Sequence, residues 1–339
     1  MAFQNATRNY SLDSLCDGVY AAFASDGGAA ISNAGMVDLG DSTLIIDTFL
    51  TPSAAEELRA DAQRLTGHIP GHVVNTHYHN DHIWGNQVFT PEADLISTIK
   101  TRVLIQTAGK EEYDDYRAIT SDRLKDLLSQ KAAAQTEAQR AALDLMIGYF
   151  AGLERDFPRL RVTLPNLVFE NRMGLYGSRR RAELIAFSGA HTSSDTVVFL
   201  PYDGIVFMSD LLFVGFHPYL GDGSPDRWLE ALNSILDGTA GIENAERFVP
   251  GHGPTGTVTD LQQLVDYIRD CQHIAQTLYK EGKTSQADVA STPIPAAYAK
   301  WTMPRFFYAN LHFLLEKYQT AVNKSLPVKP NTASNSFRP

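Results

Sequence analysis

Three histidines and an aspartate lie within one six-residue segment, residues 77–82, directly after an apolar run that predicts a strand. Residues two apart in extended chain point to the same side, so His77 and His79 can present ring nitrogens to one point. Where the strand ends, the chain can aim Asp81 and His82 at a second point beside the first. Imidazole and carboxylate together suit zinc, iron or manganese. With 10 His in 339 residues, this spacing is rare by chance and predicts a metal site.

Three later residues stand where further metal ligands are expected, because one cluster cannot complete two coordination spheres. Asp210 closes the apolar run 204–209, and His252 ends the run 248–250 at a turn flanked by glycines, where backbone can approach a ligand. His191 stands just ahead of another apolar strand. Functional residues collect at strand ends, on loops held by a rigid scaffold. The sequence therefore predicts that these three side chains join the first cluster.

The order of these motifs resembles that of the metallo-β-lactamase superfamily. The resemblance runs from Gly18 to the helix after His252, and Asp47 matches the first motif of the family. It implies an α/β fold, an αββα sandwich of two mixed sheets back to back with helices outside. Asp47 would accept hydrogen bonds that hold the ligand loop, without touching a metal.

The same resemblance implies a site for two divalent metal ions, zinc first, with iron or manganese also compatible. One ion would be held by His77, His79 and His191, a second by Asp81, His82 and His252, with Asp210 bridging the two. Asp81 would also be the catalytic residue, because its second carboxylate oxygen can take or pass a proton.

We expect residues 1–325 to form one domain of this kind, followed by a flexible tail, 326–339. Leucine, methionine and alanine at helical spacings predict a helical insertion over about 101–156, and C-terminal helices are expected over about 258–323. Local signals predict helix starts at Thr51, at Ser224, and at a capping box formed by Thr259 with Gln262. Strands are predicted at 95–98, 160–164, 167–169 and 182–187.

Composition and charge narrow the classes of partner. The net charge of -10 argues against nucleic-acid binding by phosphate neutralisation. Cys16 and Cys271 make no disulfide framework or Cys-x-x-Cys pair. We see no signal-peptide pattern and no apolar run long enough for a membrane span, so we expect a cytoplasmic enzyme with a small-molecule substrate. Both a monomer and a homo-oligomer remain open.

The expected reaction is hydrolysis by a hydroxide that bridges the two metals, on a small carbonyl substrate such as a lactone, ester, thioester or lactam. The alternative is a mononuclear iron-dependent redox enzyme of the persulfide dioxygenase type. No Gly-x-Ser-x-Gly elbow supports a serine hydrolase. Aromatic residues and a histidine near the ligands are the expected substrate contacts: Trp84, Phe213, Phe216, His217 and Tyr219.

Overall fold

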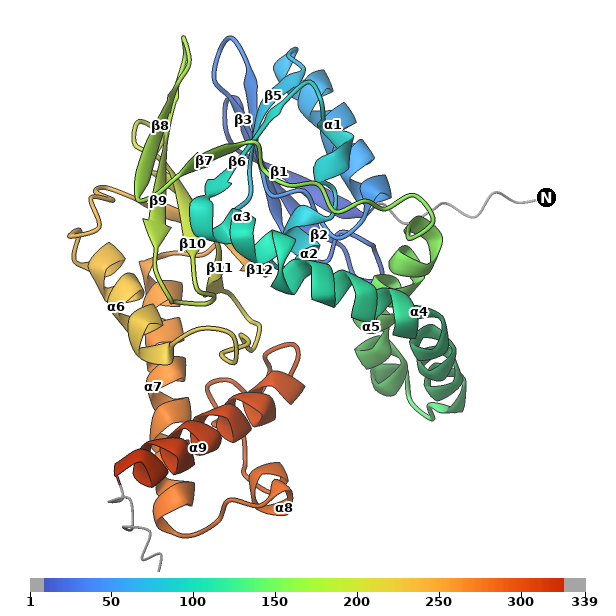
Figure 1. Ribbon diagram of the computed structural model, residues 1–339, viewed down its shortest axis with the longest axis vertical. Coiled ribbons are helices and arrows are strands. Elements are labelled where there is room, and N and C mark those ends of the chain that lie inside the picture. Colours follow the sequence, from blue (N-terminus) through green and yellow to red (C-terminus); the bar gives the residue numbers. More distant parts are fainter. Residues whose placement is uncertain (1–8, 326–339) are drawn as a thin grey trace, which may run out of the picture.

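Two β-sheets lie face to face with helices on their outer faces in the computed structural model, which describes residues 9–325 (Figure 1). The larger sheet has seven strands in sequence order, antiparallel from β1 to β4 and parallel from β4 to β7. Its strands are β1 (Tyr10–Cys16), β2 (Val19–Ala24), β3 (Ala34–Asp38), β4 (Thr43–Ile46), β5 (Pro70–Val74), β6 (Asp94–Thr98) and β7 (Leu167–Phe169).

The second sheet has five strands in the order β12-β11-β10-β9-β8. Only the β11–β12 pair is parallel, so this sheet is mixed as well. Its strands are β8 (Arg172–Tyr176), β9 (Arg181–Phe187), β10 (Asp195–Leu200), β11 (Ile205–Phe213) and β12 (Arg247–His252). The predicted sandwich of two mixed sheets is confirmed.

Buried aliphatic side chains from both sheets fill the space between them. Leu44 and Val74 meet Val198 and Phe207 there, all with 2% exposure or less. Gly35 lets the sheets approach closely, since an added Cβ would lie 2.5 Å from the ring of Phe207. Strands buried on both faces explain the continuous apolar runs that adjoin the candidate ligands.

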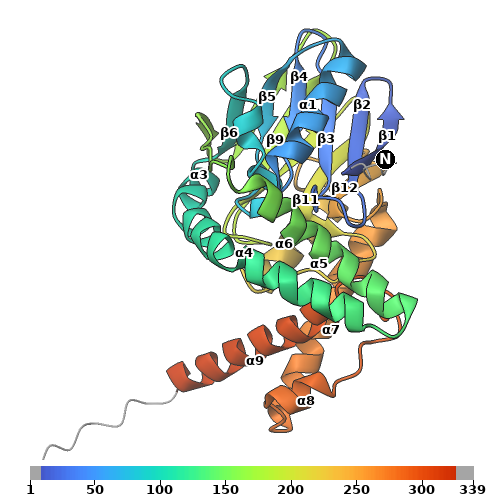
Figure 2. The same ribbon diagram turned by 90° about the vertical axis from the view of Figure 1, so that its right-hand side faces the viewer.

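Helices cover the outer face of each sheet (Figure 2). On the seven-stranded sheet, α1 (Pro52–Thr66) buries Leu58 and Ala62. The short α2 (Asn80–Ile83) and the 3-10 turn η1 (Asn86–Val88) follow β5. Beside the other sheet lie α6 (Pro225–Leu236) and α7 (Val258–Lys280), while α8 (Gln286–Ala290) and α9 (Arg305–Ser325) pack together at the lower part of α7 in the view of Figure 1.

Three helices separate β6 from β7 where the helical insertion was predicted: α3 (Ile99–Gln106), α4 (Ala108–Ala133) and α5 (Glu137–Asp156). The helices α4 and α5 pack along each other below the sandwich in the view of Figure 1. Their aromatic residues, among them Tyr113 and Phe150, join Leu50 and Trp84 in one buried cluster. The insertion is therefore fastened to the end of the sandwich that carries the segment 77–82.

Local capping signals locate two of the three predicted helix starts. Thr51 caps α1, accepting a 3.3 Å hydrogen bond from the backbone N–H of Ala54, and Gly67 ends the helix with φ 78°. Ser224 caps α6 in the same way. Both predictions are confirmed, because a cap depends on neighbouring residues alone.

The predicted capping box at Thr259 and Gln262 is wrong. The cap of α7 lies two residues earlier, at Thr257, whose backbone N–H donates to Asp260 at 2.7 Å. Overlapping Thr-x-x-polar patterns made the two registers equivalent in the sequence, and a carboxylate is the better acceptor at a helix start. The tail predicted for 326–339 lies outside the described residues.

Residues 160–164 form no strand, which corrects a second prediction. Side chains bind their backbone instead of a neighbouring strand. The backbone N–H of Arg161 donates to the side chain of Gln87, and the carbonyl of Thr163 accepts from Asn86 at 3.0 Å. A strand-like composition does not by itself supply a pairing partner.

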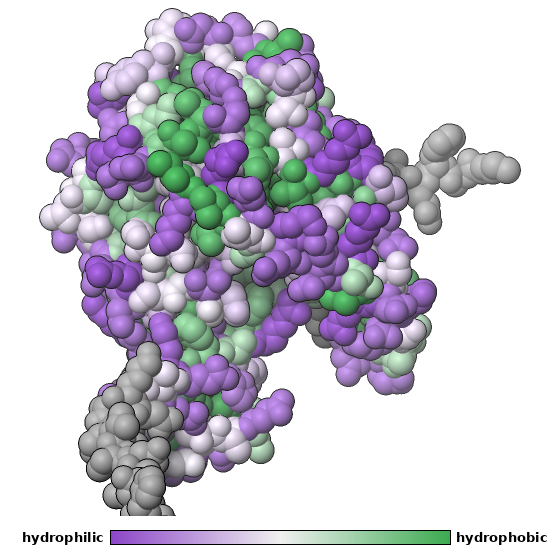
Figure 3. Space-filling view, viewed as in Figure 1, coloured by the Kyte–Doolittle hydropathy of each residue, from purple (hydrophilic) through white to green (hydrophobic). Residues whose placement is uncertain are grey.

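The surface is mixed, with apolar side chains grouped in the upper half of the face shown in Figure 3. Exposed large apolar residues occur in several elements and include Ile69, Ile99, Val103 and Val168. Among the helices of residues 9–325, none combines the length and apolar character needed to cross a membrane.

Candidate metal centre

The predicted ligands come from five places in the chain and meet at one end of the sandwich. They form two groups, and within each the donor atoms lie within 4.8 Å of one another. The groups are His77, His79, His191 and Asp210, and Asp81, His82 and His252. All seven candidates that the sequence singled out thus lie together. The expectation that Asp210 closes its strand is wrong, because β11 continues to Phe213 and Asp210 lies within it.

The first group surrounds a point between the two sheets. Nε2 of His191 lies 3.1 Å from Nδ1 of His79 and 3.3 Å from Oδ2 of Asp210. Nε2 of His77 lies 3.9 Å from the same Oδ2. Donors about 2.0–2.1 Å from a tetrahedral zinc are separated by roughly 3.3 Å, so these spacings fit one ion.

The second group has the same spacing. Nε2 of His252 lies 3.5 Å from Oδ2 of Asp81 and 3.6 Å from Oδ1 of Asp210. Nε2 of His82 lies 3.2 Å from Oδ1 of Asp210. Its imidazole and carboxylate donors suit zinc, iron or manganese, as those of the first group do.

Asp210 directs one carboxylate oxygen toward each group. Oδ2 faces His191 and His77, whereas Oδ1 faces His82 and His252. Burial would raise the pKa of this carboxyl, but the neighbouring His82 and His252 hold it well below the usual range. Gly251 makes room for the carboxylate, since an added Cβ would lie 1.8 Å from Oδ1.

Buried atoms without partners mark the positions where metal would bind. Nε2 of His77, Nε2 of His82 and Oδ1 of Asp210 are all buried and have no hydrogen-bond partner among residues 9–325. Each of these atoms points toward the other members of its group. Leaving such atoms unsatisfied is costly, and a divalent cation would satisfy them. The donor set therefore fits two metal ions.

Asp47 holds the ligand loop by hydrogen bonds. Its carboxylate accepts from the backbone N–H and the hydroxyl of Thr76, at 2.9 and 2.8 Å. It also accepts from Nδ1 of His82 at 2.8 Å and from the hydroxyl of Ser209 at 3.0 Å. Asp47 and Ser209 have positive φ, 59° and 47°. Such backbone is rare outside glycine and is retained here where it aims side chains at the site.

Asp222 orients a second histidine and was missed by the sequence analysis. Oδ2 of Asp222 lies 3.1 Å from Nε2 of His79 and accepts a hydrogen bond from the hydroxyl of Tyr78. Burial acts to raise the pKa of Asp222, but the hydrogen bonds with His79 and Tyr78 outweigh it, so the pKa of this carboxyl lies below its usual value. Asp222 lies in the loop before α6, between Gly221 and Gly223, where no periodic pattern flags a residue.

A cavity of about 340 Å³ opens onto both groups. Its wall includes four of the five predicted substrate contacts, namely Phe213, Phe216, His217 and Tyr219. Helices of the insertion supply part of the opposite wall, with Glu112 and Tyr116 from α4 and Leu145, Met146 and Tyr149 from α5. The insertion thus lines the site directly.

The prediction that Trp84 contacts substrate is wrong, because Trp84 does not line this cavity. Its side chain has 0% exposure and packs edge-on against Tyr113 and Tyr116, with Phe157 5.8 Å away between ring centroids. The residue follows α2 directly and points toward α4 and α5 rather than toward the ligands. Trp84 was predicted to contact substrate because it is only two residues from His82, but its side chain lies on the other side of the short helix α2.

His217 lies in the wall as a neutral imidazole. It is 1% exposed, and its Nδ1 lies 3.0 Å from the hydroxyl of Tyr267. Burial lowers the pKa of His217 to about 4. Its Nε2 has no hydrogen-bond partner among the described residues, so this atom can accept or donate one further hydrogen bond.

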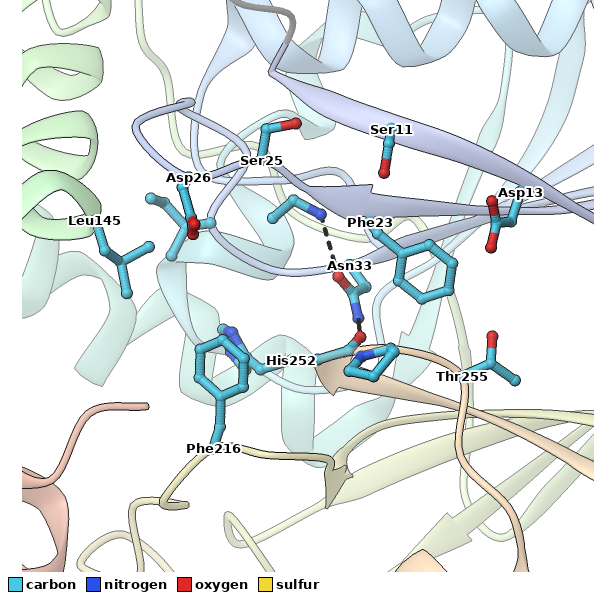
Figure 4. A pocket seen from close by; sticks show the side chains of 14 residues that line it. Ser11, Asp13, Phe23, Ser25, Asp26, Asn33, Leu145, Phe216, His252 and Thr255 are labelled. Carbon is cyan, nitrogen blue, oxygen red and sulfur yellow. Dashed lines mark hydrogen bonds between the residues drawn. The ribbon is translucent and has the colours of Figure 1, made fainter. Parts of the chain in front are cut away.

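A second cavity adjoins the first beyond His252 (Figure 4). Phe216 and His252 lie on one side of it, and Ser11 and Asp13 of β1 on the other. The side chain of Asn33 holds this region together by donating to the carbonyls of Pro250 and Gly253, at 2.9 and 2.8 Å. Of the candidate ligands, only His252 is among the described residues that line this cavity, whereas five of them line the first. The first cavity is therefore the better candidate for a substrate site.

A family model described as the metallo-beta-lactamase superfamily matches residues 27–252, about two thirds of the chain. This chain belongs to the metallo-β-lactamase superfamily. Members of this superfamily are mostly metal-dependent hydrolases. No curated protein matches the sequence.

Solved metallo-β-lactamases share the fold at low identity. One from Pontibacter korlensis is 16% identical, with a TM-score of 0.55 over 77% of this chain and 99% of that chain. TMB-1 is 17% identical, with a TM-score of 0.55 over 77% of this chain and 98% of that one. DIM-1 exposed to ceftazidime is 15% identical, with a TM-score of 0.54 over 77% and 97%. The structural similarity shows the shared fold, and at this low sequence identity it does not indicate the substrate.

Proposed function

We propose that this protein is a dinuclear metal-dependent hydrolase of small carbonyl compounds, meaning lactones, esters, thioesters or lactams. The observation that carries the proposal is the orientation of Asp210, with one oxygen toward each histidine group. A carboxylate in that position can hold two cations close together and compensate their mutual repulsion. Zinc is the first choice of metal, and iron or manganese would also fit these donors.

The ligand roles follow from the two groups. His77, His79 and His191 would hold one ion, Asp81, His82 and His252 the other, with Asp210 shared between them. Bound there, the ions would supply Lewis acidity toward the substrate oxygen and a nucleophile at neutral pH. Asp47 and Asp222 would fix the rings of His82 and His79, and such outer partners also raise the basicity of their ligands.

Protein groups would do the remaining work. Oδ2 of Asp81 faces His82 and His252, which leaves Oδ1 to take the proton from the attacking water and pass it to the leaving group. The rings of Phe213 and Phe216 would pack against the apolar part of the substrate and exclude water from the reacting carbonyl. Overall, water adds to the acyl carbon, the bond to the leaving oxygen, sulfur or nitrogen breaks, and the leaving group gains a proton.

The complete second group favours this proposal over the mononuclear iron redox enzyme. A single iron would need only the first group, whereas in the second group Nε2 of His82 is buried and has no hydrogen-bond partner in the described part of the chain. We therefore expect purified protein to contain close to two zinc, iron or manganese ions per chain. One iron per chain, with oxygen consumption on a thiol substrate, would support the redox enzyme.

The activity test is a substrate panel with a metal-removal arm. Lactones, aryl esters, thioesters, β-lactams and a phosphodiester, bis-p-nitrophenyl phosphate, are assayed with the same protein preparation. We expect hydrolysis of at least one carbonyl class, its loss with a chelator, and its return with zinc or manganese. Much faster turnover of the phosphodiester than of every carbonyl compound would overturn the proposed substrate class.

A further inference from the structure

One arginine lies in the wall of the metal-site cavity. Arg305, the first residue of α9, is the single lysine or arginine among the described residues that line this cavity. It comes from a segment beyond residue 252, where the match to the superfamily ends. Any role of Arg305 is therefore a property that this chain adds to the common fold.

The guanidinium of Arg305 has contacts that position it without neutralising it. Nη2 donates to the thioether sulfur of Met146 at 3.2 Å, and the guanidinium carbon lies 5.0 Å from the centre of the Phe306 ring. A thioether is a weak acceptor, so it does little to replace water or a carboxylate. Within residues 9–325, no carboxylate pairs with Arg305. By contrast, Arg159 pairs with both Glu56 and Asp156.

The charged and titratable groups around Arg305 supply no formal negative charge. The groups that act on it are the phenols of Tyr116 and Tyr149 and the cation of Arg123. Burial raises the pKa of both phenols, so they stay neutral at cellular pH. Partial removal of water lowers the pKa of Arg305 itself, yet a guanidinium stays charged throughout the physiological range. Arg305, an exposed residue at the edge of the cavity, therefore carries a positive charge that no carboxylate of the described residues pairs with.

Apolar side chains make up much of the rest of the wall. They are Leu145 and Met146 of α5, Phe213 at the end of β11, Phe216 after it, and Met303 and Phe306 near Arg305. The carboxyl groups in the wall are Asp81 and Asp210, which belong to the metal groups, and Glu112 of α4, which accepts a hydrogen bond from the side chain of Asn80 at 2.9 Å. A ligand with an acyl group at the metals and an anionic group at Arg305 would match each part of the wall.

We propose that the site selects substrates in which a carboxylate is joined to the reacting carbonyl by an apolar segment, and that Arg305 pairs with that carboxylate. The inference rests on the proposed function and names the substrate class within it. Arg305 would act as a specificity residue, because guanidinium and carboxylate form two parallel hydrogen bonds that a neutral ester group cannot replace. Arg305 belongs to neither ligand group, so the residue should affect substrate binding more than turnover.

Paired substrates test the proposal. The mono-4-nitrophenyl esters of straight-chain dicarboxylic acids are compared with 4-nitrophenyl esters of the monocarboxylic acids of equal chain length. We expect kcat/KM to favour the carboxylated ester by about tenfold, mainly through KM, as for one charge-assisted hydrogen-bonded pair. Arg305→Met should abolish this preference, and Arg305→Lys should restore only part of it. Arg269→Met is the matched control, because Arg269 is exposed on α7 and does not line the cavity.

The outcomes separate this inference from the proposed function. Equal kcat/KM values for the two esters, or a preference that survives in Arg305→Met, would overturn the role of Arg305 while leaving the hydrolase intact. If neither ester is hydrolysed, calorimetry on the protein as purified compares octanoate with octanamide. Tighter binding of octanoate by about tenfold, lost in Arg305→Met and kept in Arg269→Met, supports the carboxylate site on its own. Equal binding of the two compounds refutes it.

Discussion

Oδ2 of Asp222 lies 3.1 Å from Nε2 of His79, and Nδ1 of the same ring lies 3.1 Å from Nε2 of His191. Nε2 of His79 is therefore held by a carboxylate, while Nδ1 is directed into the first ligand group. This arrangement fixes which nitrogen can bind metal and increases its basicity.

Removing this carboxylate should weaken the first metal site. We expect Asp222→Ala to reduce zinc affinity by about 10–100-fold, because His79 loses the partner that sets its orientation and tautomer. Competition with a chromophoric chelator measures the change. Asp226→Ala is the control, since Asp226 is an exposed acid of α6 that accepts from Gln272. Equal zinc affinity in wild type and Asp222→Ala would show that Asp222 has no part in the site.

Substitution of Trp84 should affect stability and leave substrate binding unchanged. Its ring is fully buried between the sandwich and the aromatic residues of α4 and α5. Truncation of a buried aromatic costs about 3–5 kcal/mol of unfolding free energy, so Trp84→Ala should unfold at clearly lower denaturant concentration. Trp84→Phe should lose less. A change in KM without loss of stability would show that Trp84 contacts the substrate after all.

The pH dependence of stability should report on Glu112, which lies in the cavity wall on α4. Burial, then the charges of Asp81 and Asp222, raise the pKa of Glu112 from 4.5 to about 8. A carboxyl whose pKa is raised in the folded state favours folding most below its unfolded pKa, and this contribution is lost as the pH rises toward 8. The free energy of unfolding of metal-free protein should therefore fall between about pH 5 and pH 8.

Glu112→Gln isolates this contribution, because the amide does not titrate. Denaturant titrations across that pH range should give a flatter profile for Glu112→Gln than for wild type, with the largest difference near pH 8. Identical slopes for the two proteins would mean that Glu112 titrates as it does in the unfolded chain.

The candidate ligand set could be proposed from the sequence because its members stand beside apolar runs. Burial on both faces of a sheet leaves a continuous apolar run, and a lone polar residue after it, such as His252 at the end of β12, is conspicuous. The start of α1 was also predictable, since Thr51 and Pro52 act on residues next to them in the sequence. Both kinds of feature depend on local sequence alone.

The residues that were missed depend on contacts across long stretches of chain. Asp222 reaches His79 over 143 positions, and its loop has no period to read. Trp84 was placed wrongly because a four-residue helix turns its side chain toward α4 and α5, a direction that sequence distance from His82 does not reveal. Arg305 enters the cavity only because α9 returns to the site after α7 and α8. Tertiary packing decides all three.

The most direct test of the account is the metal content of wild type, Asp210→Ala and His252→Ala, measured by elemental analysis after identical reconstitution with zinc. We predict close to two zinc ions per chain in wild type. We predict loss from both sites in Asp210→Ala, because this carboxylate faces both groups, and loss chiefly from the second site in His252→Ala. Metal content in Asp210→Ala equal to that of wild type would contradict the bridging role of Asp210 and with it the dinuclear site.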